Sequence, residues 1–194
     1  MIAMGHRAKI AGAVLCAATN VLASPRRADE PRDPGVYVRV GAGAGVYVGP
    51  RNETSGSFFA STKPVAGLAF PFEAAVGGAV ANNLVLGLGA YGAAVPVLER
   101  KADPRVVGLI GPVLDHYWGS FDGVHAQIAL GVGTTIEERS KIDKLRASPA
   151  AAAGLGYEWR TGSRWNVGGM LGIRTLIHEK PTFVPGLLFT ATLL

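Results

Sequence analysis

Over most of the chain, apolar residues occupy every second position, and the positions between them hold mainly Gly, Ala or small polar residues. In the clearest stretch, residues 124–137, Val124 and Ile128 share one parity with the other apolar residues, while His125 and Gln127 fall on the other. Successive side chains of a β-strand point to opposite faces, so this period of two predicts strands with one continuously apolar face. No helical period fits the pattern.

The same alternation predicts eight strands. They cover residues 36–48, 65–80, 84–98, 106–118, 124–137, 148–160, 165–178 and 183–194. Within the fourth stretch we expect a slip in register near Gly111 and Pro112, where a bulge accommodates the missing N–H of proline.

The links between these strands alternate in length. Longer, polar links cover residues 50–64, 99–105, 138–147 and 179–182, whereas the intervening links are short and centre on 82–83, 119–123 and 161–164. Short turns at one end and longer loops at the other are typical of outer-membrane barrels. The sequence therefore predicts an all-β fold, a closed antiparallel eight-stranded transmembrane up-and-down β-barrel.

Charged residues are rare inside the predicted strands, and their parity is informative. Apart from the terminal residues of the strands, the five are Arg39, Glu73, Asp115, Glu158 and Arg174. Four fall on the face opposite the apolar one, and Asp115 joins them if the register slips. A basic residue facing lipid at mid-membrane costs about 2–4 kcal/mol, so this sorting fits a bilayer outside the barrel. We expect the five to form an interior charge network that fills the lumen, with His125 and Gln127 as further interior polar residues.

Aromatic residues gather at the strand ends beside the short turns. They are Trp118, Phe121, Trp159 and Trp165. An aromatic girdle at the membrane interface is expected at this position.

Composition supports β structure. The 194 residues are 48% hydrophobic and only 17% charged, and they include 27 glycines. Each interior glycine costs a helix roughly 1 kcal/mol relative to Ala, so a helical core is disfavoured.

The N-terminal region predicts export. Residues 1–23 combine a positive start, an apolar stretch and a small-residue cleavage site after Ala23, which indicates a signal peptide. Residues 24–34 are rich in proline and charge and predict a flexible periplasmic lead-in, which leaves 35–194 as the barrel domain. Cys16 suggests acylation as in a lipoprotein, but Leu15 precedes it where lipoprotein signals carry Gly, Ala or Ser, which weakens this interpretation.

Removal of the signal changes two further expectations. The single cysteine, Cys16, leaves with it, so neither a disulfide nor a thiolate metal site is expected. Loss of Arg7 and Lys9 lowers the formal charge from +5 by two, which removes the main support for binding nucleic acid.

The signal, the eight strands and the inward charges resemble the small eight-stranded outer-membrane barrels of Gram-negative bacteria, such as the OmpA membrane domain and OmpX-like proteins. The resemblance covers about residues 35–194 and implies a location in the bacterial outer membrane. It also implies membrane lipid, lipopolysaccharide and the outer-membrane assembly machinery as partners. The chain departs from that class at its end, Thr192-Leu193-Leu194, where such barrels commonly carry Phe or Trp.

The motifs that resemble catalytic or cofactor sites are incomplete. Residues 87–92 match a dinucleotide fingerprint, but a continuing β pattern follows where a helix is required. His125 and Gln127 invite comparison with outer-membrane lipid A deacylases, in which a Ser stands two residues after the His; here Gln127 replaces that nucleophile. His116, His125 and His178 lie on three strands without metal-ligand spacing. We therefore expect no cofactor, no metal and no enzymatic activity.

Three functions remain open on the sequence alone. The favoured one is a non-enzymatic outer-membrane barrel with a filled lumen, in a structural or surface-interaction role, whose charged loop 138–146 is open to a surface partner. A narrow, porin-like channel or small-molecule carrier is the second. The third is a soluble, lipocalin-like periplasmic barrel, which would need its charged parity to face water.

Overall fold

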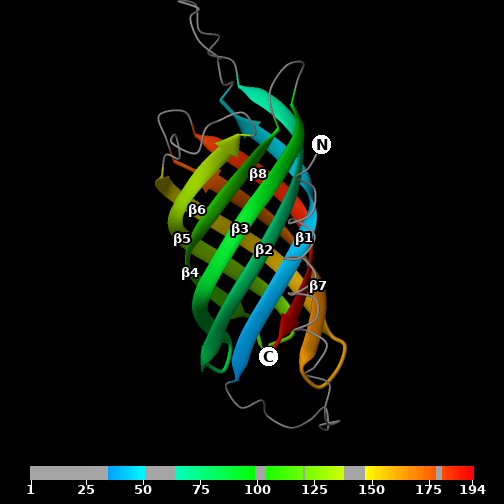
Figure 1. Cartoon of the computed structure of the whole chain (residues 1–194). Coiled ribbons are helices and arrows are strands. Elements are labelled where there is room, and N and C mark those ends of the chain that lie inside the picture. The colour runs from blue at the N-terminus through cyan, green and yellow to red at the C-terminus, as the bar shows by residue number, and fades with distance from the viewer. Residues whose placement is uncertain (1–34, 51–63, 99–103, 120, 138–146, 178–180) are drawn as a thin grey trace, which may run out of the picture. The chain divides into compact units, whose positions relative to one another are not determined.

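The computed structural model describes residues 35–50, 64–98, 104–119, 121–137, 147–177 and 181–194. They form eight strands: β1 (Val36–Gly49), β2 (Val65–Ala81), β3 (Leu84–Leu98), β4 (Arg105–Tyr117), β5 (Gly123–Glu137), β6 (Ser148–Arg160), β7 (Trp165–Leu176) and β8 (Thr182–Leu193). Each strand pairs antiparallel with the next, and β8 pairs with β1, which closes the barrel (Figure 1). The predicted closed eight-stranded up-and-down barrel is confirmed.

The strand bounds agree with the sequence pattern to within two residues at every end. The links that follow β2, β4 and β6 are the short ones, so one end of the barrel is a short-turn end and the other a long-loop end. The predicted signal, the lead-in, loop 138–146 and His178 lie outside the described residues. Within the described ranges, no helix has the length and apolarity needed to cross a membrane.

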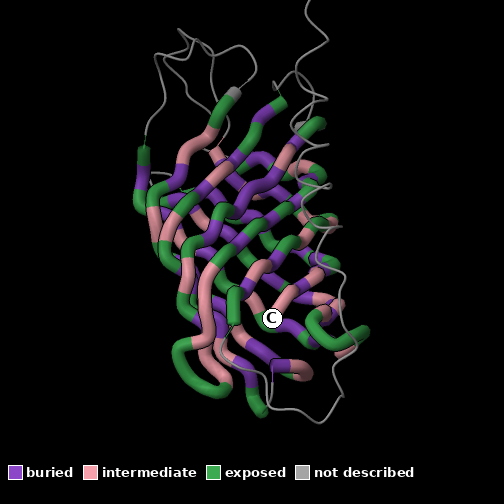
Figure 2. The backbone as a smooth tube through the Cα atoms, turned by 60° about the horizontal axis from the view of Figure 1, so that its bottom comes forward, coloured by how far each residue is buried: buried purple, intermediate pink, exposed green. Residues whose placement is uncertain are grey.

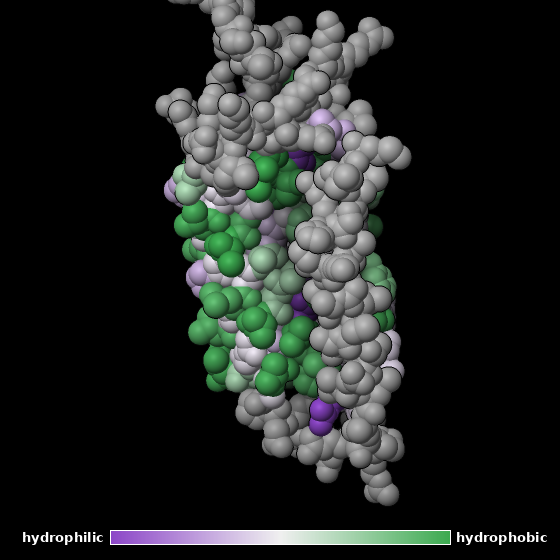
Figure 3. All heavy atoms as spheres, in the orientation of Figure 1, coloured by the Kyte–Doolittle hydropathy of each residue, from purple (hydrophilic) through white to green (hydrophobic). Residues whose placement is uncertain are grey.

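The alternation of the sequence becomes an alternation of burial in space. Figure 2 shows buried and exposed positions following each other along the strands. In β5, Val124, Ile128 and Leu130 are exposed, whereas His125 and Gln127 are buried. The visible outer face is predominantly hydrophobic (Figure 3). The apolar parity therefore faces outward, as predicted, and the glycine-rich parity faces the lumen.

The predicted register slip in β4 is wrong. The pairing of β4 with β3 runs without a shift from Leu84↔His116 to Val95↔Arg105, and Asp115 is buried at the parity expected from an unbroken strand. Pro112 lies on the exposed, outer parity. Both faces of β4 are apolar, because Val107 and Leu109 fill the lumen, so hydropathy could not distinguish them. The register shifts occur instead between β2 and β3, at Leu68/Phe70 and Ala79/Ala81.

Inward glycines let the barrel wall bend sharply at β1. A Cβ added to Gly43 would overlap the carbonyl oxygen of Leu187 in β8 and would lie 2.8 Å from the Cα of Leu188. A Cβ added to Gly186 in β8 would lie 2.9 Å from the ring of Pro71 in β2. Strands β2 and β8 therefore approach each other across the inner face of β1, and only residues without a side chain fit between them.

Candidate functional site in the barrel lumen

Arg39 is the centre of a buried ionic network in the lumen. Its Nε lies 3.0 Å from Glu73 Oε1, and its Nη1 lies 2.9 Å from Asp115 Oδ2 and 3.5 Å from Glu158 Oε1. All four side chains are buried. The guanidinium group of Arg39 on β1 therefore links carboxylates from β2, β4 and β6 across the barrel.

The carboxylates of Asp115 and Glu158 are also held by hydroxyl groups. The Tyr37 hydroxyl donates to Asp115 Oδ2 at 2.9 Å, and the Tyr117 hydroxyl donates to Glu158 Oε2 at 3.2 Å. Thr192 Oγ1 donates to Glu158 Oε1 at 2.7 Å. A buried charge is tolerated when it is both paired and hydrogen-bonded, and this arrangement supplies both.

Glu73 connects the network to β7. Its second oxygen, Oε2, lies 3.1 Å from Nη2 of Arg174, so this carboxylate is shared between two guanidinium groups. The partner of each oxygen is different, Arg39 for Oε1 and Arg174 for Oε2. Charge-assisted bonds of this kind are stronger than neutral hydrogen bonds and fix the side-chain geometry.

His125 lies against the same cluster. Its Nδ1 lies 2.8 Å from Asp115 Oδ1, and its ring stacks on Tyr117 with centroids 4.9 Å apart and an interplanar angle of 16°. Nη1 and Nη2 of Arg39 lie 3.3 and 3.5 Å from the two ring nitrogens. Gln127, two residues further along β5, is buried, and its Nε2 has no hydrogen-bond partner among the described residues.

The structure thus places all seven of the residues singled out in the sequence inside the barrel, and it joins six of them through Arg39, Asp115 and Glu73. Sequence reasoning missed three classes of partner. Two of them belong to the network: the hydroxyl donors Tyr37, Tyr117, Thr190 and Thr192, and the thioether of Met170, which lies 3.3 Å from Arg39 Nη2. The third is Arg105, a buried cation outside the network, which binds Tyr47. The tyrosines occupy the inward parity of their strands, which is the signal that identifies them.

Arg105 was assigned to a loop and instead begins β4. Its side chain is buried, and Nη1 donates to the Tyr47 hydroxyl at 2.9 Å and to the carbonyl of Pro50 at 3.3 Å. The guanidinium carbon also lies 5.2 Å from the centroid of the Tyr47 ring. This cation–π contact lies at the long-loop end, away from the Arg39 network.

The lumen has two chemically different halves. The charged side chains of the Arg39 network lie mainly toward the short-turn ends of the strands, together with buried apolar residues such as Val85 and Val113. Most buried residues at the long-loop ends are apolar: Val65, Ala69, Ala93, Val95, Val107, Ala150, Leu176 and Val184. The buried polar residues there include Arg105, Ser148 and Thr182, the first residues of β4, β6 and β8. We expected the charge network, with His125 and Gln127, to fill the lumen, and apolar side chains fill much of its long-loop half as well.

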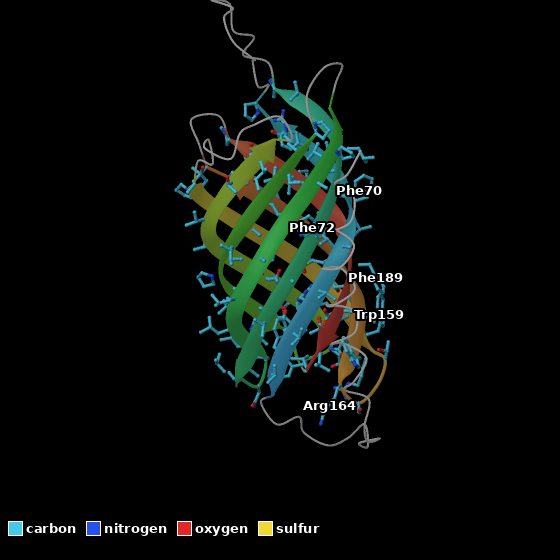
Figure 4. All side chains as sticks on the ribbon, viewed as in Figure 1. Phe70, Phe72, Trp159, Arg164 and Phe189 are labelled. Atoms are coloured by element: carbon cyan, nitrogen blue, oxygen red, sulfur yellow. The ribbon has the colours of Figure 1, made fainter. Side chains whose placement is uncertain are left out.

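The predicted aromatic girdle is only partly present. Trp118 and Trp159 are 56% and 58% exposed, and Trp159 points away from the barrel in Figure 4. Phe121 is 8% exposed, so its predicted interfacial position is wrong. Its ring packs on Tyr117 at 5.5 Å because the β4–β5 turn folds inward, and Asn166 donates a hydrogen bond to the Phe121 carbonyl.

The geometry of the network favours a lumen that is closed by side chains. The charged groups bind one another, and each network side chain is almost completely buried. Among the described residues, no group of three or more His, Cys, Asp or Glu has an arrangement suited to a metal ion.

An apolar exterior, a closed antiparallel wall of eight strands and an interior filled by side chains are the features of the small eight-stranded outer-membrane barrel fold. The chain is similar in structure to Neisserial surface protein A, with a TM-score of 0.55 and 10% identity over 81% of this chain and 96% of that one. Two further similar structures are OprG from Pseudomonas aeruginosa (TM-score 0.45, 13% identity, 84% and 99% covered) and Ail from Yersinia pestis (0.42, 10%, 82% and 99%).

No family model and no curated protein matches the sequence. The likeness to Neisserial surface protein A shows the predicted fold, that of the small eight-stranded outer-membrane barrels. At 10% identity it concerns the fold alone.

Proposed function

We propose that the protein is a non-enzymatic, integral barrel of the bacterial outer membrane, with a filled lumen and a structural or surface-interaction role. The observation that carries the proposal is the separation of the two faces of the wall. Large apolar side chains such as Leu130, Leu171 and Phe189 are exposed on the outside, while Arg39, Glu73 and the other network charges lie inside. Phe70, Phe72 and Phe189 point outward in Figure 4.

The two alternative functions fit these faces less well. In a soluble lipocalin-like barrel the apolar face lines the interior, which is the reverse of the arrangement here. A channel needs a continuous polar path, and the mostly apolar side chains of the long-loop half, such as Val107 and Leu176, disfavour one. Membrane lipid is the partner that the exterior fits. Lipopolysaccharide and the assembly machinery follow from the proposed location, and a surface role is consistent with the name of Neisserial surface protein A.

The first test is biochemical. We expect the expressed protein to fractionate with outer membranes, to need detergent for extraction and to migrate differently on gels before and after heating. In planar lipid bilayers the folded protein should carry no steady current. Extraction without detergent would support the soluble barrel, and stepwise conductance would support the channel; either result contradicts the proposal.

A charge placed on the outer face provides a second prediction. Leu130 lies in the middle of β5 and is 62% exposed, while Val124 lies near its short-turn end and is 42% exposed. In lipid vesicles, Leu130→Arg should lower the free energy of unfolding by about 2–4 kcal/mol, and Val124→Arg by about 0–1 kcal/mol, because the cost of a basic residue depends on depth. Reversible urea unfolding followed by tryptophan fluorescence measures both. Equal effects at the two sites argue for a water-exposed outer face.

A further inference from the structure

The aromatic side chain of Phe121 is buried at the short-turn end of the lumen. Phe121 packs on Tyr117 at 5.5 Å, and Tyr117 stacks on His125 at 4.9 Å, so three rings form a column from the mouth to the ionic network. Asn166, at the start of β7, binds the Phe121 carbonyl. Phe121, in the turn between β4 and β5, is therefore held by a strand that neighbours neither β4 nor β5.

Behind this turn, the lumen contains donors without protein acceptors. Gln127 Nε2, Tyr91 Oη and Arg174 Nε have no hydrogen-bond partner among the described residues, and all three side chains are buried. Gln127 is paired across the sheet with Asp115, and Tyr91 with Glu73, so these donors border the Arg39 network. An unsatisfied buried donor costs about 1–3 kcal/mol, and water is its usual partner in protein interiors.

Water cannot reach these donors easily from the other side. Between the Arg39 network and the buried Arg105 at the long-loop end, the lumen holds the apolar side chains of Val65, Ala93, Val95, Val107 and Leu176. An ion crossing this layer would lose its hydration without gaining a partner, which is strongly unfavourable. The short-turn mouth is then the route by which water and small polar solutes enter.

We propose that the lumen is a half-channel. Phe121 is the stopper of its short-turn mouth, the Arg39 network with its unpaired donors is the part of the lumen that water reaches, called here the chamber, and the apolar layer beyond it is the seal that prevents passage. This inference rests on the proposed filled barrel and adds the position of the stopper and of the seal. Under the proposed location, the chamber faces the periplasm.

Two reporter cysteines on one strand test the proposal. Val85 and Ala93 both lie on β3, point inward and are fully buried, but Val85 is next to the network, opposite Asp115, and Ala93 lies in the apolar half. Each is replaced by cysteine in a Cys16→Ser background of the full chain, so the reporter is the single thiol. The probe is a small, water-soluble cationic methanethiosulfonate, which forms a mixed disulfide with the thiolate and releases methanesulfinate.

We expect Phe121→Ala to increase the modification rate of Val85→Cys on the order of tenfold or more, which corresponds to about 1.4 kcal/mol in opening free energy. Trp118→Ala is the matched control, because Trp118 lies beside the same turn but is exposed on the outside, and it should leave the rate unchanged. Ala93→Cys should stay slow in every background, and the Phe121→Ala barrel should carry no current.

Three results overturn the half-channel. They are equal rates for Val85→Cys with and without Phe121, faster modification of Ala93→Cys in the Phe121→Ala background, and a current through that variant. Heat-modifiable migration checks that each variant is folded, and Asn166→Ala, which releases the turn but keeps the ring, replaces Phe121→Ala if the latter does not fold. The parent barrel is measured alongside: a current through it contradicts the proposed function itself, whereas the reporter rates concern only the stopper and the seal.

Discussion

Replacing Arg39 with Met should lower the free energy of unfolding by about 3–5 kcal/mol, the range found when one partner of a buried ion pair is removed. Met replaces the aliphatic part of Arg but carries no charge, so the substitution leaves Glu73, Asp115 and Glu158 buried without their common cation. These three carboxylates lie within 3.5 Å of the Arg39 side chain on three different strands. Urea unfolding in detergent micelles or vesicles, followed by tryptophan fluorescence, measures the change.

Arg160 provides the matched control. It forms an ion pair with Asp122 at 3.6 Å, but the two side chains are 28% and 32% exposed. Exposed pairs contribute about 0–1 kcal/mol, so Arg160→Met should have a small effect. Asp115→Asn combined with Arg39→Met should cost less than the sum of the two single changes, because the neutral amide no longer needs the cation. If Arg39→Met destabilises the barrel no more than Arg160→Met does, the network is not what holds the lumen together.

The wall of the barrel could be predicted from the sequence because contact with lipid constrains it in a simple way. Every second side chain of a strand must be apolar, and a charge on that parity is costly. Val124, Ile128 and Leu130 follow this rule along β5, which is why the strand bounds and the outward face were predicted closely. The inward parity of Arg39 and Glu73 follows from the same rule.

The lumen is less predictable because its side chains pack against one another and not against lipid or water. In β4, Val107 and Leu109 are as apolar as the lipid-facing residues, so hydropathy did not separate the two faces, and Pro112 led to the prediction of a slip that does not exist. Phe121 is an aromatic residue beside a turn, like Trp118, and only the fold of that turn decides that one points inward and the other outward. Parity also leaves open which inward charges meet, since that depends on the stagger between strands far apart in sequence.

The glycines on the inward parity lead to the last prediction. Gly43→Val should lower the free energy of unfolding by at least about 3 kcal/mol, the upper part of the range for overpacking, since the new side chain meets backbone that has nowhere to move. Its Cβ would overlap the carbonyl oxygen of Leu187, in the strand that closes the barrel against β1. The expected signs are loss of heat-modifiable migration and a lower urea midpoint.

Gly108→Val separates closure of the barrel from the general preference of strands for branched residues. Gly108 lies within β4, and an added Cβ there would have no heavy atom within 4 Å. Valine favours strands more than glycine does, so this variant should be at least as stable as the parent. If both variants were equally stable, Gly43 would have no special role in closure of the barrel. A loss confined to Gly43 shows instead that the small residues alternating with apolar ones have a geometric role: they let β1 bend between β2 and β8, and so allow eight strands to close around a lumen that side chains can fill.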